Sequence, residues 1–333
     1  MIVERAISFA ELRAEWSALP VRSVFATWEW HDAWWRHFGG GLELELRAVR
    51  KEGELVGVLP LCRSRLGPLR IVRFTGRPQA DEQGPVGAVG DAQLLAALAE
   101  IEHDVFLGEQ LPGSEDWPRR LAGRRFRLES GPVIRRAGGW QAYLASRSAN
   151  FRQQLQRRER RLHERHDVVF RLTVEPVTLE RDLDVLFTLH RSRWGTASAF
   201  APETFHREIA RSALETGRLR LWFLDLDGTP AAAWYGFRVG NVESYYQAGR
   251  DASYDDVSAG SVLLAHTIRQ ALDDGVAEYR LLRGDEAYKR RFADDDPGLE
   301  TVIRPNSARG RAAVTAALAG KRARAVLFRR GSD

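Results

Sequence analysis

The order of hydrophobic and polar positions along the chain switches between strand-like and helix-like periods, which predicts a mixed α/β protein. Leu42 to Val49 alternates leucine with glutamate, and Glu54 to Leu61 follows the Glu52-Gly53 turn as the returning strand, so we expect a half-buried hairpin over 42–61. Residues 28–38 instead place Trp30, Trp34 and Phe38 four positions apart, which indicates one buried helical face. Further elements of this part are expected as strands at 71–74 and 104–107 and as a helix from Asp91 to Ala99.

The second part of the pattern predicts an antiparallel meander followed by a strand–loop–helix unit. Three strand-like runs, 219–225, 231–239 and 242–248, are separated by the turn dipeptides Asp227-Gly228 and Gly240-Asn241. The remaining elements are expected as a helix over 140–166, a strand at 168–174, helices at 179–194, 202–216 and 262–272, a strand at 279–282, and a helical tail after Pro305. We therefore expect largely antiparallel central sheets.

Length and composition bound the number of domains and the class of protein. A chain of 333 residues suggests about two domains, and its 44% apolar content is that of an ordinary folded protein. We place the join at Gly138-Gly139, which gives expected domains at 1–139 and 140–305 and a basic helical tail at 306–333. With Cys62 as its one cysteine the chain offers neither an intramolecular disulfide nor a cysteine zinc cluster, so we expect no metal.

The sequence shows neither a secretory signal nor a membrane-spanning segment. Glu4 and Arg5 interrupt the start of the chain, and no apolar run approaches the ~18 residues that a spanning helix needs. We expect a cytoplasmic protein that does not insert into membranes. No pattern in the sequence indicates an oligomeric state.

Positive charge is concentrated in one segment, although the net charge is only +5. The expected helix over 140–166 carries seven arginines, at positions 147, 152, 157, 158, 160, 161 and 165. Such a face either keeps the protein soluble or binds a polyanion, which would be a nucleotide cofactor or RNA. The segment lacks interleaved exposed aromatics, which disfavours binding to single-stranded nucleic acid.

Two stretches are candidates for a functional site. Residues 276–292 run as a short strand, turn at Gly284 and continue with Asp285, Tyr288 and Lys289 at helical spacing, and α/β proteins often bind ligands where a strand ends. The alternative is an ordinary exposed helix start. Upstream, Ser258–Ser261 precedes the helix at 262–272, an arrangement whose backbone N–H groups can bind an anion.

Four segments together resemble one known family. They are Phe151-Arg152-Gln153-Gln154-Leu155, Leu189-His190-Arg191-Ser192-Arg193-Trp194, Ser258-Ala259-Gly260-Ser261 and Leu282-Arg283-Gly284-Asp285-Glu286-Ala287-Tyr288-Lys289. In order and spacing they resemble the GNAT acyltransferase superfamily over about 145–295, specifically its CelD-like branch, linked to cellulose and exopolysaccharide biosynthesis. That branch is akin to the Fem aminoacyltransferases, and the N-terminal half looks like the degenerate GNAT-like unit that Fem-like proteins carry.

The resemblance implies direct transfer of an acyl group from acyl-CoA, with acetyl-CoA as the expected donor, to an amine of a small molecule or saccharide. It assigns the base to Asp285 or Glu286 and the acid that protonates the thiolate to Tyr288. The site residues that it implies are Ser258, Ala259, Gly260 and Ser261 for the cofactor, and Arg193, Trp194, Arg283 and Lys289 for the substrate. The loop departs from the superfamily pattern, because it lacks the leading Gln or Arg.

Two other functions remain open at this stage. The first is a Fem-type transferase that uses aminoacyl-tRNA and holds the tRNA on the arginine-rich helix. Fem enzymes often carry a long coiled-coil insertion, and no such heptad hairpin is present here, which favours the acyl-CoA enzyme. The second is a GNAT scaffold without catalysis. The cluster of Asp285, Glu286, Tyr288 and Lys289 argues against a scaffold.

Overall fold

The chain folds into two compact units. The computed structural model describes residues 1–333 except 136–137, 196–199, 201 and 331–333, and it describes only the backbone of 193–194 and 321–330. The first unit comprises 1–21, 25–129 and 297–333, and the second comprises 22–24 and 130–296. This division differs from the expected borders after residues 139 and 305. A short strand near residue 133 joins the sheet of the second unit, and the strand at Leu299–Pro305 returns to a sheet of the first.

The first unit contains an antiparallel sheet of order β1-β3-β4-β7 and a mixed sheet of order β2-β5-β6-β8-β16-β9. Its strands are β1 (Ile2–Arg5), β2 (Glu43–Leu44), β3 (Arg47–Lys51), β4 (Glu54–Leu59), β5 (Leu61–Leu66), β6 (Leu69–Phe74), β7 (Val86–Gly87), β8 (Val105–Pro112), β9 (Arg124–Glu129) and β16 (Leu299–Pro305). Its α-helices are α1 (Arg13–Ser17), α2 (Trp28–Phe38), α3 (Asp91–Glu100), α4 (Trp117–Arg120) and α11 (Ala308–Arg330).

The second unit is built on one sheet of order β10-β15-β14-β13-β12-β11. Its strands are β10 (Val133–Ile134), β11 (Val168–Leu172), β12 (Leu219–Leu226), β13 (Thr229–Val239), β14 (Val242–Arg250) and β15 (Glu278–Arg280). Its helices are α5 (Gly139–Ser146), α6 (Ala149–Arg165), α7 (Pro176–Trp194), α8 (Glu203–Glu215), α9 (Ala259–Asp273) and α10 (Ala287–Phe292). All neighbouring strands are antiparallel except β14 and β15, which are parallel. The largely antiparallel sheets predicted from the sequence are therefore confirmed.

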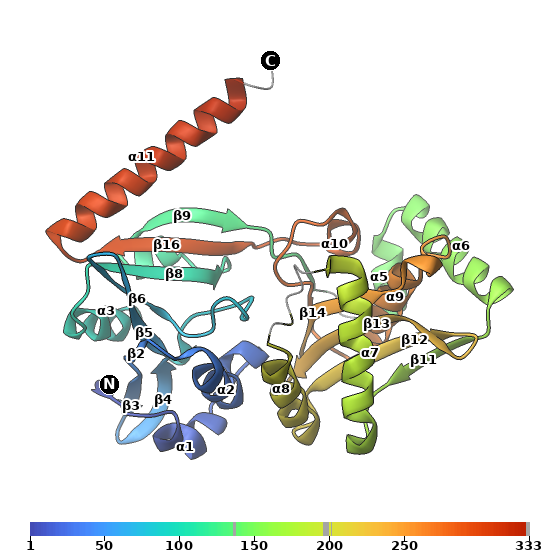
Figure 1. Ribbon diagram of the computed structural model, residues 1–333, viewed down its shortest axis with the longest axis horizontal. Coiled ribbons are helices and arrows are strands. Elements are labelled where there is room, and N and C mark those ends of the chain that lie inside the picture. The colour runs from blue at the N-terminus through green and yellow to red at the C-terminus, as the bar shows by residue number, and fades with distance from the viewer. Residues whose placement is uncertain (136–137, 196–199, 201, 331–333) are drawn as a thin grey trace. The chain divides into compact units, whose positions relative to one another are not determined.

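Alternation along β13 divides the core of the second unit between the two faces of its sheet. Trp234 packs with the helix α9 residues in one cluster, whereas the next residue, Tyr235, meets His206 of α8 on the other face. Figure 1 shows α7 and α9 crossing this sheet on opposite sides. Because side chains of a strand alternate between faces, a run of apolar residues can supply both layers.

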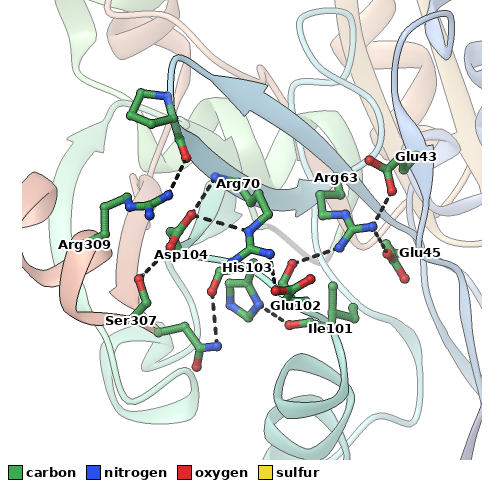
Figure 2. A network of polar contacts seen from close by, with 12 residues as sticks. Glu43, Glu45, Arg63, Arg70, Ile101, Glu102, His103, Asp104, Ser307 and Arg309 are labelled. Carbon is green, nitrogen blue, oxygen red and sulfur yellow. Dashed lines mark hydrogen bonds and ion pairs between the residues drawn. The ribbon is translucent and has the colours of Figure 1, made fainter.

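A polar network holds the start of the C-terminal helix in the first unit (Figure 2). The Asp104 carboxylate accepts hydrogen bonds from the Arg70 backbone N–H at 2.9 Å and from Ser307 Oγ at 2.7 Å. Arg309 donates to the Pro68 carbonyl at 3.0 Å, and the Asn306 N–H donates to the Asp104 carbonyl at 2.8 Å. The bonds that the Arg70 N–H and the Ser307 hydroxyl donate to the Asp104 carboxylate lower its pKa. All of these contacts together hold the segment in place. They fix 306–310 against the start of β8, which explains why the last segment belongs to the first unit.

Most of the expected elements occur within a few residues of their predicted ends, with three corrections. The hairpin expected over 42–61 is β3 with β4 alone, because residues 43–44 pair with β5 in the other sheet. The single helix expected over 140–166 is two helices, because Ser148 caps α6 by accepting from the Phe151 N–H at 3.2 Å. The polar composition of residues 81–85 favours a solvated loop, but Asp81 is only 5% exposed. Neighbouring Gln83 donates to Gln110 Oε1 at 2.7 Å inside the unit.

Candidate functional site

Strand β14 has a free edge where it extends past its parallel neighbour. Pairing with β15 covers Val242 to Ser244 only, and β14 continues to Arg250. After β15 the chain continues beside the β10 segment, since the Leu281 N–H donates to the Pro132 carbonyl at 2.9 Å. Within the part of the chain that the structure describes, no strand pairs with this side of β14 after Ser244. Backbone groups along such an edge can hydrogen-bond an extended ligand.

Helix α9 begins beside the end of β14 and presents its first N–H groups there. Ser258 adopts a left-handed conformation at φ 59°, and its carbonyl accepts the N–H groups of Ser261 and Val262 at 2.9 and 3.1 Å. The N–H groups of Ala259 and Gly260 have no acceptor among the described residues. Two unbonded N–H groups at the positive end of a helix dipole favour an anion.

A cavity of about 340 Å³ lies between these two elements. Its lining comes from β13, β14, the loop after β14, the first turns of α9, and α10, with Trp234, Tyr245, Arg250, Asp255, Ser258, Gly260, Ser261 and Tyr288 among the lining residues. A Cβ at Gly260 would lie 3.3 Å from Cδ of Arg250, so a side chain there would extend into the cavity. The cavity thus joins the predicted cofactor loop to the predicted acid, Tyr288.

An ion pair between Arg250 and Asp255 forms part of the cavity wall. Arg250 is the last residue of β14, and Asp255 follows one turn of 3-10 helix at 252–254. The loop at 251–257 contains neither Gln nor Arg. The cation at this site therefore comes from the strand rather than from the loop.

Two tyrosine hydroxyls meet in the cavity. The Tyr288 hydroxyl from α10 lies 3.1 Å from the Tyr245 hydroxyl from β14, within hydrogen-bond distance. Their rings contact edge to face, with centroids 6.5 Å apart. Tyr288 is half-buried, which leaves its hydroxyl accessible from the cavity.

The charged residues around Gly284 stabilise a turn and do not line the cavity. Asp285 precedes α10, is 72% exposed and is ion-paired with Arg290. Glu286 lies 3.3 Å from Nζ of Lys289, and that buried Nζ also donates to the Arg283 carbonyl at 2.6 Å. Gly284 has φ 134°, and a Cβ there would collide with Glu286. The expectation that Asp285 shares a helical face with Tyr288 is wrong, because the helix starts at Ala287.

The remaining predicted substrate residues lie in two different places. Arg283 contributes its carbonyl to the turn and does not line the cavity. Arg193 and Trp194 lie in the last turn of α7, and their side chains lie outside the described residues. One turn earlier, His190 Nδ1 lies 2.9 Å from the carbonyl of Ala248, a cavity residue of β14. The end of α7 is thereby fixed to the strand that forms the site.

Sequence reasoning missed Tyr245, Trp234, Arg250 and Asp255. Tyr245 and Trp234 sit within the meander, where alternation by itself gives only a face of the sheet and not a cavity. Arg250 could have been predicted, since it is a cation at the end of the strand that leads into the expected anion-binding loop. Among the described residues, no cluster of His, Cys, Asp and Glu is arranged to hold a metal ion, and no helix is long and apolar enough to span a bilayer.

Comparison with known proteins finds a family model that covers most residues of this site. Residues 149–290 match the family model of the acetyltransferase (GNAT) domain. Among solved structures, FemX is similar at 12% identity and a TM-score of 0.62, with 92% of this chain and 96% of that chain covered. The C-terminal domain of a putative lysylphosphatidylglycerol synthetase from Agrobacterium fabrum is similar at 14% identity and a TM-score of 0.58, over 92% and 96% of the two chains. At these identities the likeness establishes the fold. No curated protein sequence matches the chain significantly.

Proposed function

We propose that this chain, whose residues 149–290 form a GNAT acyltransferase domain, is an N-acyltransferase that takes its acyl group from acyl-CoA, with acetyl-CoA as the simplest donor. One observation carries the proposal: a single cavity contains both the first turn of α9 and the Tyr288 hydroxyl. The first can hold a pyrophosphate, and the second can reach the sulfur of a thioester that runs along the free edge of β14.

The residues present fit coenzyme A in three respects. The N–H groups of Ala259 and Gly260 and the Arg250 guanidinium can bind phosphate oxygens at one end of the cavity. The unpaired edge of β14 after Ser244 can bond the amides of the pantetheine arm. Trp234 and Tyr245 present aromatic surface from the sheet to the acyl end.

The reaction is a direct attack of an amine on the thioester carbonyl. The amine must be uncharged when it attacks, the carbonyl oxygen must be stabilised as it becomes negative, and the sulfur must be protonated as it leaves. We assign the last task to Tyr288. Asp285 and Glu286 were the predicted bases, but both are engaged in ion pairs at the turn. We propose that they hold the turn in place instead.

Ligand binding tests the proposal before any acceptor is known. Titration calorimetry and thermal shift with CoA and acetyl-CoA should show saturable binding and a higher melting temperature, because a ligand that binds the folded state stabilises it. Pantetheine, which lacks the pyrophosphate and the nucleotide attached to it, should bind at least tenfold more weakly than CoA. Absence of CoA and acetyl-CoA binding to the folded protein would overturn the proposal.

A specific observation favours an aminoacyl-tRNA donor as the second candidate. Arg158 of α6 and Arg291 of α10 are close enough that burial and this like charge lower the pKa of Arg158. Neither arginine has an ion-pair partner among the described residues. Two adjacent cations without a counter-ion fit a phosphate of a polyanion. Charged tRNA belongs in the same thermal-shift screen, and stabilisation by tRNA without stabilisation by CoA would select this candidate.

A further inference from the structure

The tyrosine pair in the cavity combines a half-buried tyrosine with a buried one. Tyr245 is only 6% exposed and comes from the middle of β14, where it pairs with Gly236 of β13. Tyr288 lies in the first turn of α10 and is half-buried. The two oxygens are 3.1 Å apart. Both tyrosines line the cavity, and Tyr288 is the more exposed of the two.

The chemistry of a hydroxyl pair fixes the direction of the hydrogen bond during acid catalysis. Each phenol has one proton to donate and lone pairs to accept. When Tyr288 points its proton at a leaving sulfur, only its lone pairs remain for Tyr245. The Tyr245 hydroxyl must then be the donor. A donor to an oxygen that becomes negative stabilises the ionised form and lowers its pKa.

Ion pairs balance the charges around the two tyrosines. The ammonium of Lys289 lies 5.7 Å from the centroid of the Tyr245 ring and is itself 5% exposed. Glu286 balances that charge at 3.3 Å, and Arg250 with Asp255 forms a second balanced pair in the same cavity wall.

We infer that Tyr245 is a positioning residue that donates a hydrogen bond to Tyr288 and thereby makes Tyr288 a stronger acid toward the leaving thiolate. The inference rests on the proposed acyl transfer at this same cavity. In the step, the C–N bond forms and the C–S bond breaks, and the sulfur takes the Tyr288 proton to become the CoA thiol. The proton that the amine nitrogen loses passes to solvent, and Tyr288 regains a proton from solvent.

The role predicts a specific ionisation behaviour that needs no acceptor substrate. Near-ultraviolet absorbance follows tyrosinate formation as the pH rises, and the difference between the wild type and Tyr288→Phe isolates the titration of Tyr288. The second comparison is between Tyr245→Phe and the double variant Tyr245→Phe/Tyr288→Phe. Their absorbance difference isolates the titration of Tyr288 when Tyr245 has lost its hydroxyl. We expect loss of the Tyr245 hydroxyl to raise the pKa of Tyr288 by about one unit, a tenfold change in its ionisation constant.

Controls separate this inference from the proposed function. Tyr254→Phe removes the hydroxyl of a tyrosine whose ring packs on His166. This variant should leave the Tyr288 titration unchanged. CoA affinity measured on the same proteins tests the cavity itself. If the wild type fails to bind CoA, the proposed function falls whatever the titration shows.

The inference has its own negative outcome. Phe keeps the aromatic ring of Tyr245, so the variant should keep its melting temperature within a few degrees. If the folded Tyr245→Phe protein binds CoA normally and the pKa of Tyr288 stays within a few tenths of its wild-type value, the Tyr245 hydroxyl plays no part in the acid and the inference is overturned.

Discussion

The guanidinium of Arg250 is ion-paired with the carboxylate of Asp255 in the wall of the cavity, so the strand supplies the cation that the loop lacks. We expect a phosphate group to compete with Asp255 for this cation. Arg250→Gln should then weaken CoA binding about tenfold, or ~1.4 kcal/mol, and reduce its salt dependence.

Asp255→Asn is the matched variant for that prediction. It removes the competing carboxylate and leaves the cation in place, so CoA affinity measured by calorimetry should stay the same or rise. Equal losses of affinity in both variants would show that the ion pair only supports the loop.

Gly260 lines the cavity at the start of α9, so a charged side chain added there would enter the proposed phosphate site. Gly260→Asp places a carboxylate toward the proposed phosphate position, and we expect CoA affinity to fall at least tenfold, ~1.4 kcal/mol. Gly260→Ala adds only a Cβ, 3.3 Å from the flexible Arg250 side chain, and should bind nearly as the wild type does. An unchanged dissociation constant for a folded Gly260→Asp protein would reject this loop as the phosphate site.

The turn carboxylates and Tyr288 should separate in kinetic assays once an acceptor is known. Glu286→Gln removes the partner of the buried Lys289 ammonium and should lower the melting temperature while kcat per folded molecule is kept. Asp285→Asn, in an exposed pair, should change little. Tyr288→Phe should lower kcat by ~10²-fold with near-normal stability. A loss of kcat of that size in Glu286→Gln at normal stability would restore the catalytic assignment of that carboxylate.

The arginine-rich helix α6 distinguishes the two candidate donors. Changing Arg157, Arg158 and Arg161 to Gln should weaken tRNA binding and flatten its salt dependence if the helix binds a polyanion. A charge-matched control changes Arg124, Arg127 and Arg181, three exposed arginines on other elements. Filter binding at several salt concentrations measures the tRNA affinity and its salt dependence for both triple variants. Equal effects of the two triple variants would show that α6 is only a solvated face.

The Asp104 network predicts a pH-dependent contribution to the stability of the first unit. Its hydrogen bonds lower the folded-state pKa of Asp104 below the unfolded value of ~3.9, so the stabilisation is fully present above that value and is lost as the pH falls through the folded pKa. Asp104→Asn should cost about 1–3 kcal/mol at pH 7, because the carboxylate bonds to Ser307 and Arg70 are weakened.

Urea denaturation followed by tryptophan fluorescence measures this cost at several pH values. The difference between the wild type and Asp104→Asn should shrink below pH ~4, where the wild-type carboxylate becomes protonated. Glu164→Gln, an exposed carboxylate of α6, serves as the control with little effect at any pH. A constant difference down to pH ~2 would contradict the assigned titration.

Local patterns were sufficient for most elements and for one half of the site. The turn dipeptides at 227–228 and 240–241 predicted the meander, because tight-turn chemistry acts over a few residues. The small-residue loop predicted the start of α9, and the last strand predicted the neighbourhood of Tyr288. These inferences needed only backbone preferences and side-chain period.

The rest of the site depends on contacts between residues far apart in the sequence. That Tyr245 meets Tyr288 follows from the parallel pairing of β14 with β15, which places α10 beside a strand more than thirty residues upstream. The position of Asp285 depends on where α10 begins, and helix ends are set by the turn around Gly284 and its ion pairs.

The sequence by itself determined the mixed α/β class, the meander and the loop–helix junction, because each follows from interactions between near neighbours along the chain. Only the tertiary structure decided which strand closes each unit and which side chains line the cavity. The return of β16 to the first unit illustrates the reason: its apolar pattern fits either sheet, and only pairing with β8 and β9 selects one.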